Sequence, residues 1–268
     1  MKKYVNLFVF VFMVGACFSQ GKAQTKSAVS YKNPVVDIAM PDPTVIKAAD
    51  GYFYMYATES TRNVPIMKSK DLVQWTYCNT AFTNKTRPRF EPKAGIWAPD
   101  INYINNKYVL YYAMSVWGGE QTCGIGVATA DSPQGPFTDH GKMFRSNEIG
   151  VQNSIDPSFL QYEGRNYLVW GSFRGIYVIE LTEDGLSLKP GAEKKRIAGT
   201  AFEAAYIHKH GDYYYMFASI GSCCEGIRST YKVVVGRSKK VWGPYKDKSG
   251  KPMLKNGYSC LLYTSDAA

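Results

Sequence analysis

Residues 155–172 read IDPSFLQYEGRNYLVWGS, and residues 41–58 read PDPTVIKAADGYFYMYAT. Both stretches open with Asp-Pro, continue as a short apolar segment, turn at a polar pair that contains Gly, and end in an aromatic-rich segment. A polar turn between two segments of β-branched and aromatic residues predicts a β-hairpin. The chain therefore repeats one predicted hairpin, each time headed by an acidic residue.

The same pattern occurs at residues 98–113 and 203–219, so that four acidic residues head four units: Asp42, Asp100, Asp156 and Glu203. They lie 58, 56 and 47 residues apart. Segments that close on Gly-Pro-aromatic, at 124–137 and 233–245, provide outer strands for such units. A repeat of this length with about four strands is typical of a β-propeller. The sequence predicts an all-β chain with no amphipathic helix longer than two turns.

In a propeller the innermost strand of each blade runs along the axis, so acids at the starts of these strands converge at one mouth. A single Asp before Pro is most often a turn residue. Acids at matching places in repeats favour a functional site, and we assign Asp42, Asp156 and Glu203 to it. Glycoside hydrolysis requires an acid that protonates the leaving oxygen and a carboxylate that acts on water or carbon. A third carboxyl group can raise the pKa of the acid.

Other chemistry is less favoured by the composition. The three histidines, His140, His208 and His210, have no metal-ligand spacing. The net charge of +10 comes from scattered lysines and arginines, which excludes the concentrated basic stripe of a nucleic-acid binder. We interpret this charge as solvated surface, with weak attraction to an acidic polymer such as pectin as the alternative. Adjacent Cys223 and Cys224 could bridge each other only through a strained ring, so we expect both reduced, or one paired with a distant cysteine.

Residues 1–23 are predicted to be a signal peptide: two lysines precede an apolar run, and cleavage after Ala23 fits a small-x-small site. The alternative is a lipid anchor through Cys17, because residues 14–17 resemble a lipobox. Either reading predicts an exported protein that is periplasmic, attached to the cell surface or secreted. Residues 24–268 are the predicted propeller domain.

Four motifs, PDPTV (41–45), WAPDI (97–101), NSIDPSF (153–159) and FEAAYI (202–207), resemble glycoside hydrolase family 43 in order and spacing. The segments at 171–181 and 221–238 are more particularly similar to its endo-α-1,5-L-arabinanase branch. The resemblance covers roughly residues 33–250. It implies a five-bladed propeller that hydrolyses internal α-1,5-L-arabinofuranosyl linkages of arabinan with inversion. An exo-acting α-L-arabinofuranosidase or β-xylosidase, and a non-catalytic sugar-binding propeller, stay open as alternatives.

Carried over by motif, the resemblance implies that Asp42 is the general base and Glu203 the general acid. Asp156 then raises the pKa of Glu203 and orients it. The residues expected to contact substrate are Trp97, Gly118, Asn153, Ser154, Ile155, Ser172 and Phe173. For Trp97 the chemistry of the residue itself leaves two readings, stacking on a sugar or packing in the blade. Asp100 is expected to be a structural hydrogen-bond acceptor, and Trp117 could line the groove.

The sequence departs from the family pattern in three ways. Arg174 stands where relatives often carry Trp, so a stacking platform is lost or replaced by a guanidinium. Ala205 replaces a Pro in the acid motif. A fifth blade is expected to begin after about residue 250, and GYSCLLYTSDAA (257–268) lacks the blade pattern, so we expect a C-terminally truncated chain with the fifth blade largely missing. The visible residues require no cofactor, calcium is allowed by resemblance only, and a monomer is expected.

Overall fold

The computed structural model describes residues 30–263, with side chains described up to residue 260. The chain divides into two units, Met1–Lys32 and Asn33–Ala268, and the fold below is that of the second. The predicted signal peptide, its cleavage site after Ala23 and the possible anchor Cys17 lie outside the described residues. No helix within the described part is long and apolar enough to cross a bilayer.

The second unit contains four four-stranded antiparallel sheets. The first sheet comprises β1 (Thr44–Lys47), β2 (Phe53–Tyr56), β3 (Pro65–Ser69) and β4 (Trp75–Thr80). The second comprises β5 (Gly95–Ile104), β6 (Lys107–Ser115), β7 (Gly124–Ala130) and β8 (Thr138–Arg145). The third comprises β9 (Ser158–Tyr162), β10 (Arg165–Trp170), β11 (Ile176–Glu180) and β12 (Lys195–Ala198). The fourth comprises β13 (Glu203–His210), β14 (Tyr213–Ile220), β15 (Lys232–Ser238) and β16 (Ser259–Tyr263).

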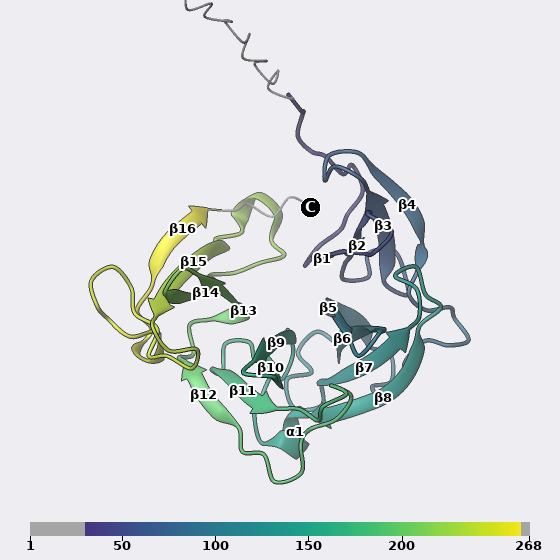
Figure 1. Cartoon of the computed structure of the whole chain (residues 1–268). Coiled ribbons are helices and arrows are strands. Elements are labelled where there is room, and N and C mark those ends of the chain that lie inside the picture. Colours follow the sequence, from purple (N-terminus) through teal and green to yellow (C-terminus); the bar gives the residue numbers. More distant parts are fainter. Residues whose placement is uncertain (1–29, 264–268) are drawn as a thin grey trace, which may run out of the picture. The chain divides into compact units, whose positions relative to one another are not determined.

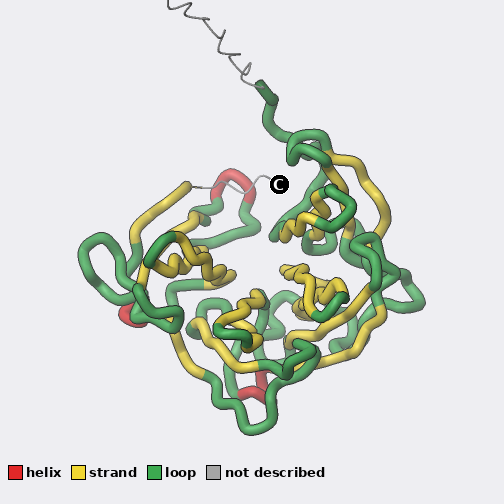
Figure 2. The backbone as a smooth tube through the Cα atoms, in the orientation of Figure 1, coloured by secondary structure: helices red, strands yellow, loops and turns green. Residues whose placement is uncertain are grey.

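The strands of each sheet follow one another in chain order, so each sheet is a simple meander. Within this unit the first strands β1, β5, β9 and β13 lie nearest the common centre, and β4, β8, β12 and β16 lie outermost (Figure 1). The predicted all-β propeller is confirmed with four blades, and a fifth blade stays a prediction. The helical segments among residues 30–263 are short: α1 (Ser146–Ile149), η1 (Gly226–Arg228) and η2 (Met253–Lys255) (Figure 2).

The predicted hairpin turns join the first two strands of each blade. Asn105 and Asn106 have φ of 48° and 64°, and Glu163 and Gly164 have φ of 50° and 72°. Positive φ at both central residues is the conformation of a type I′ turn, whose twist matches that of the flanking strands. These pairs therefore fix the register of the inner hairpins of the second and third blades.

The end of the described chain belongs to the fourth blade. The segment 257–268 lacks the pattern of an inner hairpin, yet β16 (Ser259–Tyr263) is the outer strand of the fourth sheet. It pairs antiparallel with β15, with Val233 opposite Leu262. The segment lacks the hairpin signals of an inner strand, but an outer strand needs only one partner, so the pattern of the inner hairpins could not identify it.

The core lies between facing sheets and not inside any one of them. Phe82 at the end of the first blade packs edge-on against Tyr112 of β6, with ring centroids 5.8 Å apart. Phe144 of β8 packs against Trp170 of β10 at 5.2 Å. A third buried cluster joins residues of β10 and β11 to residues of β13 and β14. The aromatic richness of these strands thus serves the contacts between blades, where large side chains fill the space between twisted sheets.

Candidate active site

A residue with left-handed backbone conformation lies just before the inner strand or within its first residues in each blade. Asp42 has φ 50°, Ala98 φ 41°, Asp156 φ 58° and Ala204 φ 51°. In every blade, regular pairing of the inner strand begins or resumes two residues later. Non-glycine residues rarely adopt this conformation, and strain of this kind concentrates at functional sites. The repeat therefore presents one side chain per blade at the same point.

This register corrects the expectation of four equivalent acids. Asp42 and Asp156 occupy the left-handed position, each followed by Pro. In the second blade that position is Ala98, and Asp100 lies two residues further on. In the fourth blade it is Ala204, and Glu203 lies one residue before it. Asp100 and Glu203 consequently point differently from the two Asp-Pro aspartates, and their environments differ accordingly.

Asp100 is a structural acceptor, as expected. Its Oδ2 accepts hydrogen bonds from the backbone N–H of Phe159 at 2.7 Å and from Asn102 Nδ2 at 2.8 Å. Its Oδ1 lies 3.4 Å from the hydroxyl of Thr44. Burial raises the pKa of Asp100 to about 6, against the lowering effect of these donors. One carboxyl group thus joins the inner strands of three consecutive blades.

Asp42, Asp156 and Glu203 are brought together by the inner strands of the first, third and fourth blades. The pKa of Asp156 is raised well above its ordinary value, first by burial and then by the negative charges of Glu203 and Asp42. The backbone N–H of Ala204 donates to Asp156 Oδ2 at 3.2 Å and partly offsets this rise. Carboxyl groups whose charges raise one another's pKa values resist ionising together. The three carboxyl groups as a set therefore retain a proton to a higher pH than an exposed carboxyl group does.

Glu203 is buried, with 9% of its surface exposed, and burial raises its pKa, with a smaller contribution from the charge of Asp42. Two hydroxyl groups act in the opposite direction. Tyr231 donates to the carboxylate, as does Ser172 Oγ, which lies 2.7 Å from Glu203 Oε2. The hydroxyl of Ser219 in turn donates to the Tyr231 oxygen. Tyr231 lies in the segment 221–238, and no sequence pattern predicts this role for it.

Asp42 is the most exposed of the three acids. The hydroxyl of Thr58, just after β2, donates to Asp42 Oδ2 at 2.5 Å. The same Thr58 oxygen accepts the backbone N–H of Ala98 at 2.7 Å. Thr58 therefore fixes the orientation of Asp42 relative to the second blade, and the residue is exposed to solvent.

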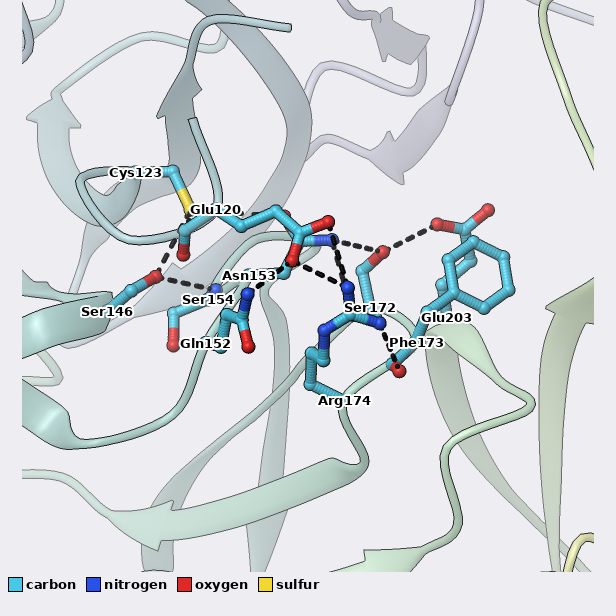
Figure 3. Close-up of polar contacts among 10 residues, drawn as sticks. All are labelled: Glu120, Cys123, Ser146, Gln152, Asn153, Ser154, Ser172, Phe173, Arg174 and Glu203. Atoms are coloured by element: carbon cyan, nitrogen blue, oxygen red, sulfur yellow. Dashed lines mark hydrogen bonds and ion pairs between the residues drawn. The ribbon is translucent and has the colours of Figure 1, made fainter. Parts of the chain in front are cut away.

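A chain of polar contacts leads to Glu203 from the third blade (Figure 3). Asn153 Nδ2 donates to Ser172 Oγ at 2.9 Å, and Ser172 donates to Glu203. Ser172 follows Gly171, whose φ of 127° brings its Cα against the carbonyl oxygen of Gly175. A Cβ at position 171 would lie 2.2 Å from that oxygen, so only glycine allows the strand to present Ser172 here.

Ser154 and Ile155, the other two residues of the 153–155 segment, are buried beneath the loop that carries Asn153. Ser154 is fully buried, its hydroxyl donating to Val151 O and accepting from Trp170 Nε1 at 3.0 Å. Because none of Ser154 is accessible, we interpret it as a support for the loop and not as a sugar contact. Ile155 is also buried, in a small apolar cluster with Ala113 and Cys123.

Trp97 packs within the protein, and its stacking on a sugar stays a prediction. Its half-buried ring packs on the apolar cluster of Ile155, while Trp117 lies edge-on at 6.3 Å. Trp117 is 78% exposed, and its neighbour Gly118 is exposed with φ 80° and open space around its Cα. The pair forms an accessible aromatic corner, which is the kind of surface on which sugar rings stack. Phe173 is half-buried, and its N–H donates to Phe202 O.

Arg174, which stands where relatives often carry Trp, forms an ion pair with Glu120. The ion pair is bidentate, with Arg174 Nη2 at 3.1 Å and 2.7 Å from the two carboxylate oxygens. Gln152 donates to the same carboxylate, and the backbone N–H of Asn153 donates to Glu120 O at 2.7 Å (Figure 3). Glu120 thus joins the β6–β7 loop to both loops of the third blade that carry site residues.

No group of three or more His, Cys, Asp or Glu in a metal-binding arrangement exists among the described residues. The carboxyl groups of the site accept hydrogen bonds from hydroxyl and N–H groups. Cys78, Cys123 and Cys260 are free thiols in the described part. Cys223 Sγ and Cys224 Sγ lie 2.7 Å apart, in hydrogen-bond contact.

Comparison with known proteins decides the family. The family model of glycosyl hydrolases family 43 matches residues 31–264, which include every residue of this site. The chain belongs to glycoside hydrolase family 43. The chain is similar to the extracellular endo-α-(1→5)-L-arabinanase 1 of Bacillus subtilis, with 38% identity over an alignment of 234 residues that covers 82% of this chain and 71% of that protein.

Another family 43 relative is the extracellular exo-α-(1→5)-L-arabinofuranosidase ArbA of Cellvibrio japonicus, 34% identical over 249 residues, with 82% of this chain and 70% of that protein covered. Among solved structures, the α-L-arabinanase of Cellvibrio cellulosa aligns with a TM-score of 0.77 and 32% identity, covering 85% of this chain and 79% of that chain. The same enzyme has been solved in complex with arabinohexaose.

Proposed function

We propose that this protein is an exported arabinanase that hydrolyses α-1,5-L-arabinofuranosyl linkages within arabinan chains. The observation that carries the proposal is the convergence of Asp42, Asp156 and Glu203 from three blades, with the pKa values of Asp156 and Glu203 both raised. Relatives that are named arabinanases support the substrate, and relatives that are named extracellular support the location. A sugar-binding propeller would need aromatic surfaces but not three mutually interacting acids.

The proposed reaction is a single displacement. Ionised Asp42 removes a proton from water, and the water oxygen attacks the anomeric carbon. The bond from that carbon to the leaving oxygen breaks, and Glu203 delivers its proton to the leaving oxygen. Asp42 then holds one proton and Glu203 has lost one, and exchange with solvent restores both. Inversion is what family membership implies for this geometry.

Asp156 has a positioning role in this scheme. The charge of Glu203 raises the pKa of Asp156, and the hydrogen bond from Ala204 N–H holds Asp156 beside the residue that follows the acid. Burial raises the pKa of both groups. Because the interaction between two carboxyl groups is reciprocal, they titrate as a pair, and the pair keeps a proton to a higher pH than an exposed carboxyl group does.

The direct test is the pair Asp42→Asn and Glu203→Gln, assayed on linear arabinan. Each substitution keeps the shape of the side chain, and we expect hydrolysis to fall by about 10²–10⁴-fold in each, while binding of arabino-oligosaccharides is retained. Glu203→Gln should recover much of its rate on aryl glycosides whose phenol leaves without protonation, whereas Asp42→Asn should not. Unchanged hydrolysis of arabinan by either variant would refute the assignment.

Exo action is the second candidate, because one relative of comparable identity is named an exo-acting enzyme. Product size at early times separates the two. We expect a mixture of oligosaccharides and a rapid loss of viscosity, as endo cleavage requires. Release of one product size from the chain ends, without loss of viscosity, would assign the protein to the exo group. The anomeric configuration of the first product, read by NMR, tests inversion.

A further inference from the structure

The fourth blade carries a basic surface pocket that the reaction does not use. Its volume is about 340 Å³, within the range of small-ligand sites. The charged and aromatic residues that line it are Tyr213, Arg237, Lys239, Lys246, Asp247 and Lys248. We call this set the basic pocket. None of its members belongs to the candidate active site.

The basic pocket lies at the far end of the inner strand from Glu203. β13 begins at Glu203 and spans eight residues, or about 23 Å at roughly 3.3 Å per residue. Tyr213 follows the turn at the other end of that strand, at the start of β14 (Figure 1). A ligand in the pocket would therefore leave the carboxyl groups of the active site untouched.

The backbone holds the pocket in a defined shape. Arg237 and Lys246 exchange two backbone hydrogen bonds, both 2.9 Å long, so the segment after Tyr245 extends the edge of β15. The turn that follows is closed by Asp247, whose Oδ1 accepts from Ser249 N at 2.9 Å and from Lys251 N at 2.8 Å. The cationic side chains thus project from paired backbone and not from a loose loop.

Four cationic side chains surround this hollow, and all four residues are exposed. Within residues 30–263, none of them forms an ion pair with an acid. The Arg237 guanidinium lies 4.6 Å from the centroid of the Tyr213 ring, an arrangement that fixes its plane by cation–π attraction. The carboxyl group of Asp247 is the one negative group of the lining, and its oxygen is already engaged in the turn. The excess of positive charge favours an anionic ligand.

We propose that the basic pocket binds the carboxylates of an acidic polysaccharide made of uronic acid units. A guanidinium held in one plane matches a carboxylate bidentately, and the surrounding lysines supply charge without a fixed geometry. A polymer with a carboxylate on each sugar can occupy several cations at once. The inference rests on the proposed function in one respect: arabinan in plant walls belongs to pectin, whose acidic backbone would bring this ligand to the enzyme.

The test compares two triple variants with the same loss of charge. Lys239→Gln/Lys246→Gln/Lys248→Gln removes lysines of the pocket, and Lys85→Gln/Lys194→Gln/Lys195→Gln removes exposed lysines elsewhere. Binding to polygalacturonate is measured by affinity electrophoresis and calorimetry at low salt and at 0.5 M salt. We expect the pocket variant to lose at least tenfold in affinity and the control variant less than twofold. Binding by the wild-type protein should weaken strongly with salt.

Two further readouts make the outcome decisive. Hydrolysis of linear, uncharged arabinan should be the same in both variants and the wild type, because the pocket lies away from the site. An equal loss of polygalacturonate binding in both variants would overturn the proposal in favour of non-specific charge. Binding of phosphatidylglycerol vesicles in place of polygalacturonate, with the same dependence on the pocket, would overturn it in favour of a membrane surface. If arabinan hydrolysis fails while polygalacturonate still binds, the proposed function is wrong and the pocket assignment survives.

Discussion

The hydroxyl of Ser172 donates a 2.7 Å hydrogen bond to Oε2 of Glu203, and the two residues also form an isolated antiparallel β-bridge. Ser172 follows the third blade's β10, and Glu203 opens the fourth blade. The residue proposed as the acid is therefore oriented from the neighbouring blade. Asn153, on the loop before β9, donates to the same hydroxyl and fixes its direction.

Replacement of Ser172 by Ala should impair the acid without removing it. The hydrogen bond from Ser172 lowers the pKa of Glu203, so its loss should raise that pKa, while the carboxyl group gains rotational freedom. We expect kcat/KM on arabinan to fall by about 10- to 100-fold, and the alkaline limb of the pH profile to move to higher pH. Ser172→Thr keeps the hydroxyl and should restore the wild-type limb. An unshifted limb in Ser172→Ala would show that the bond does not act on the proton donor.

Tyr231→Phe tests the second donor separately. A hydroxyl that donates to the ionised form of a carboxyl group lowers its pKa, and Tyr231 donates to Glu203. The proposed acid must be protonated to act. Removal of the Tyr231 hydroxyl should therefore extend activity to higher pH, and kcat/KM at the optimum should fall by up to tenfold. The pH dependence of kcat/KM measures this. Tyr215→Phe, on β14, is the matched control and should leave the profile unchanged; an identical shift in both variants would contradict a specific role for Tyr231.

The propeller could be predicted from the sequence because residues that lie next to one another in the chain specify its inner hairpins. Polar turn pairs such as Asn105-Asn106, between aromatic segments, need no tertiary information. The outer strand β16 carries no such signal, since its position depends only on pairing with β15. The aromatic residues between blades were visible as composition, but their partners, such as Phe144 and Trp170, are far apart in sequence and could not be matched.

The site was predictable where a residue type and a repeat position coincided, as they do for Asp42 and Asp156. Glu203 was also placed by the repeat, although it lies one residue out of register with the two aspartates, and its role as the acid came from the family resemblance. Tyr231 was missed because a tyrosine in a loop resembles any other, and its role arises only from the folding of β14 and β15. The ion pair of Arg174 with Glu120 joins positions 54 residues apart, which no local pattern indicates.

The Arg174–Glu120 pair should affect substrate binding more than stability. Both side chains are partly exposed, at 42% and 34%, and exposed ion pairs contribute about 0–1 kcal/mol to folding. Glu120→Gln should leave the free energy of unfolding within about 1 kcal/mol of the wild type, since the backbone of Glu120 still holds Asn153. It releases the guanidinium beside Phe173, and we expect KM for arabino-oligosaccharides to change several-fold with kcat nearly constant.

Arg174→Trp is the informative partner of that variant. If the position lines the substrate groove, an indole should supply a stacking surface and lower KM. The neutral change Glu180→Gln, in an ion pair of the same blade remote from the site, is the control for general effects of charge. Equal KM values in all of these variants would show that Arg174 and Glu120 do not line the path of the substrate.

Asp100 makes folding depend on pH in a predictable direction. Its pKa in the folded protein is about 6, above the ordinary value of 3.8, because burial disfavours its charge. Between these values the unfolded chain releases the proton and the folded chain keeps it. The contribution of Asp100 to stability is therefore fully present below about pH 4 and is lost as the pH rises through about 6, by up to about 3 kcal/mol.

Asp100→Asn cannot ionise, so it should remove this dependence. We expect the free energy of unfolding of the wild type, relative to Asp100→Asn, to decline between about pH 4 and 6 in urea titrations. The comparison cancels the contributions of the other carboxyl groups. Asp212→Asn, in the exposed turn between β13 and β14, is the matched substitution and should show no such decline. A wild-type difference that stays flat with pH would mean that the pKa of Asp100 is not raised by folding, and that the junction of the three blades tolerates a buried charge.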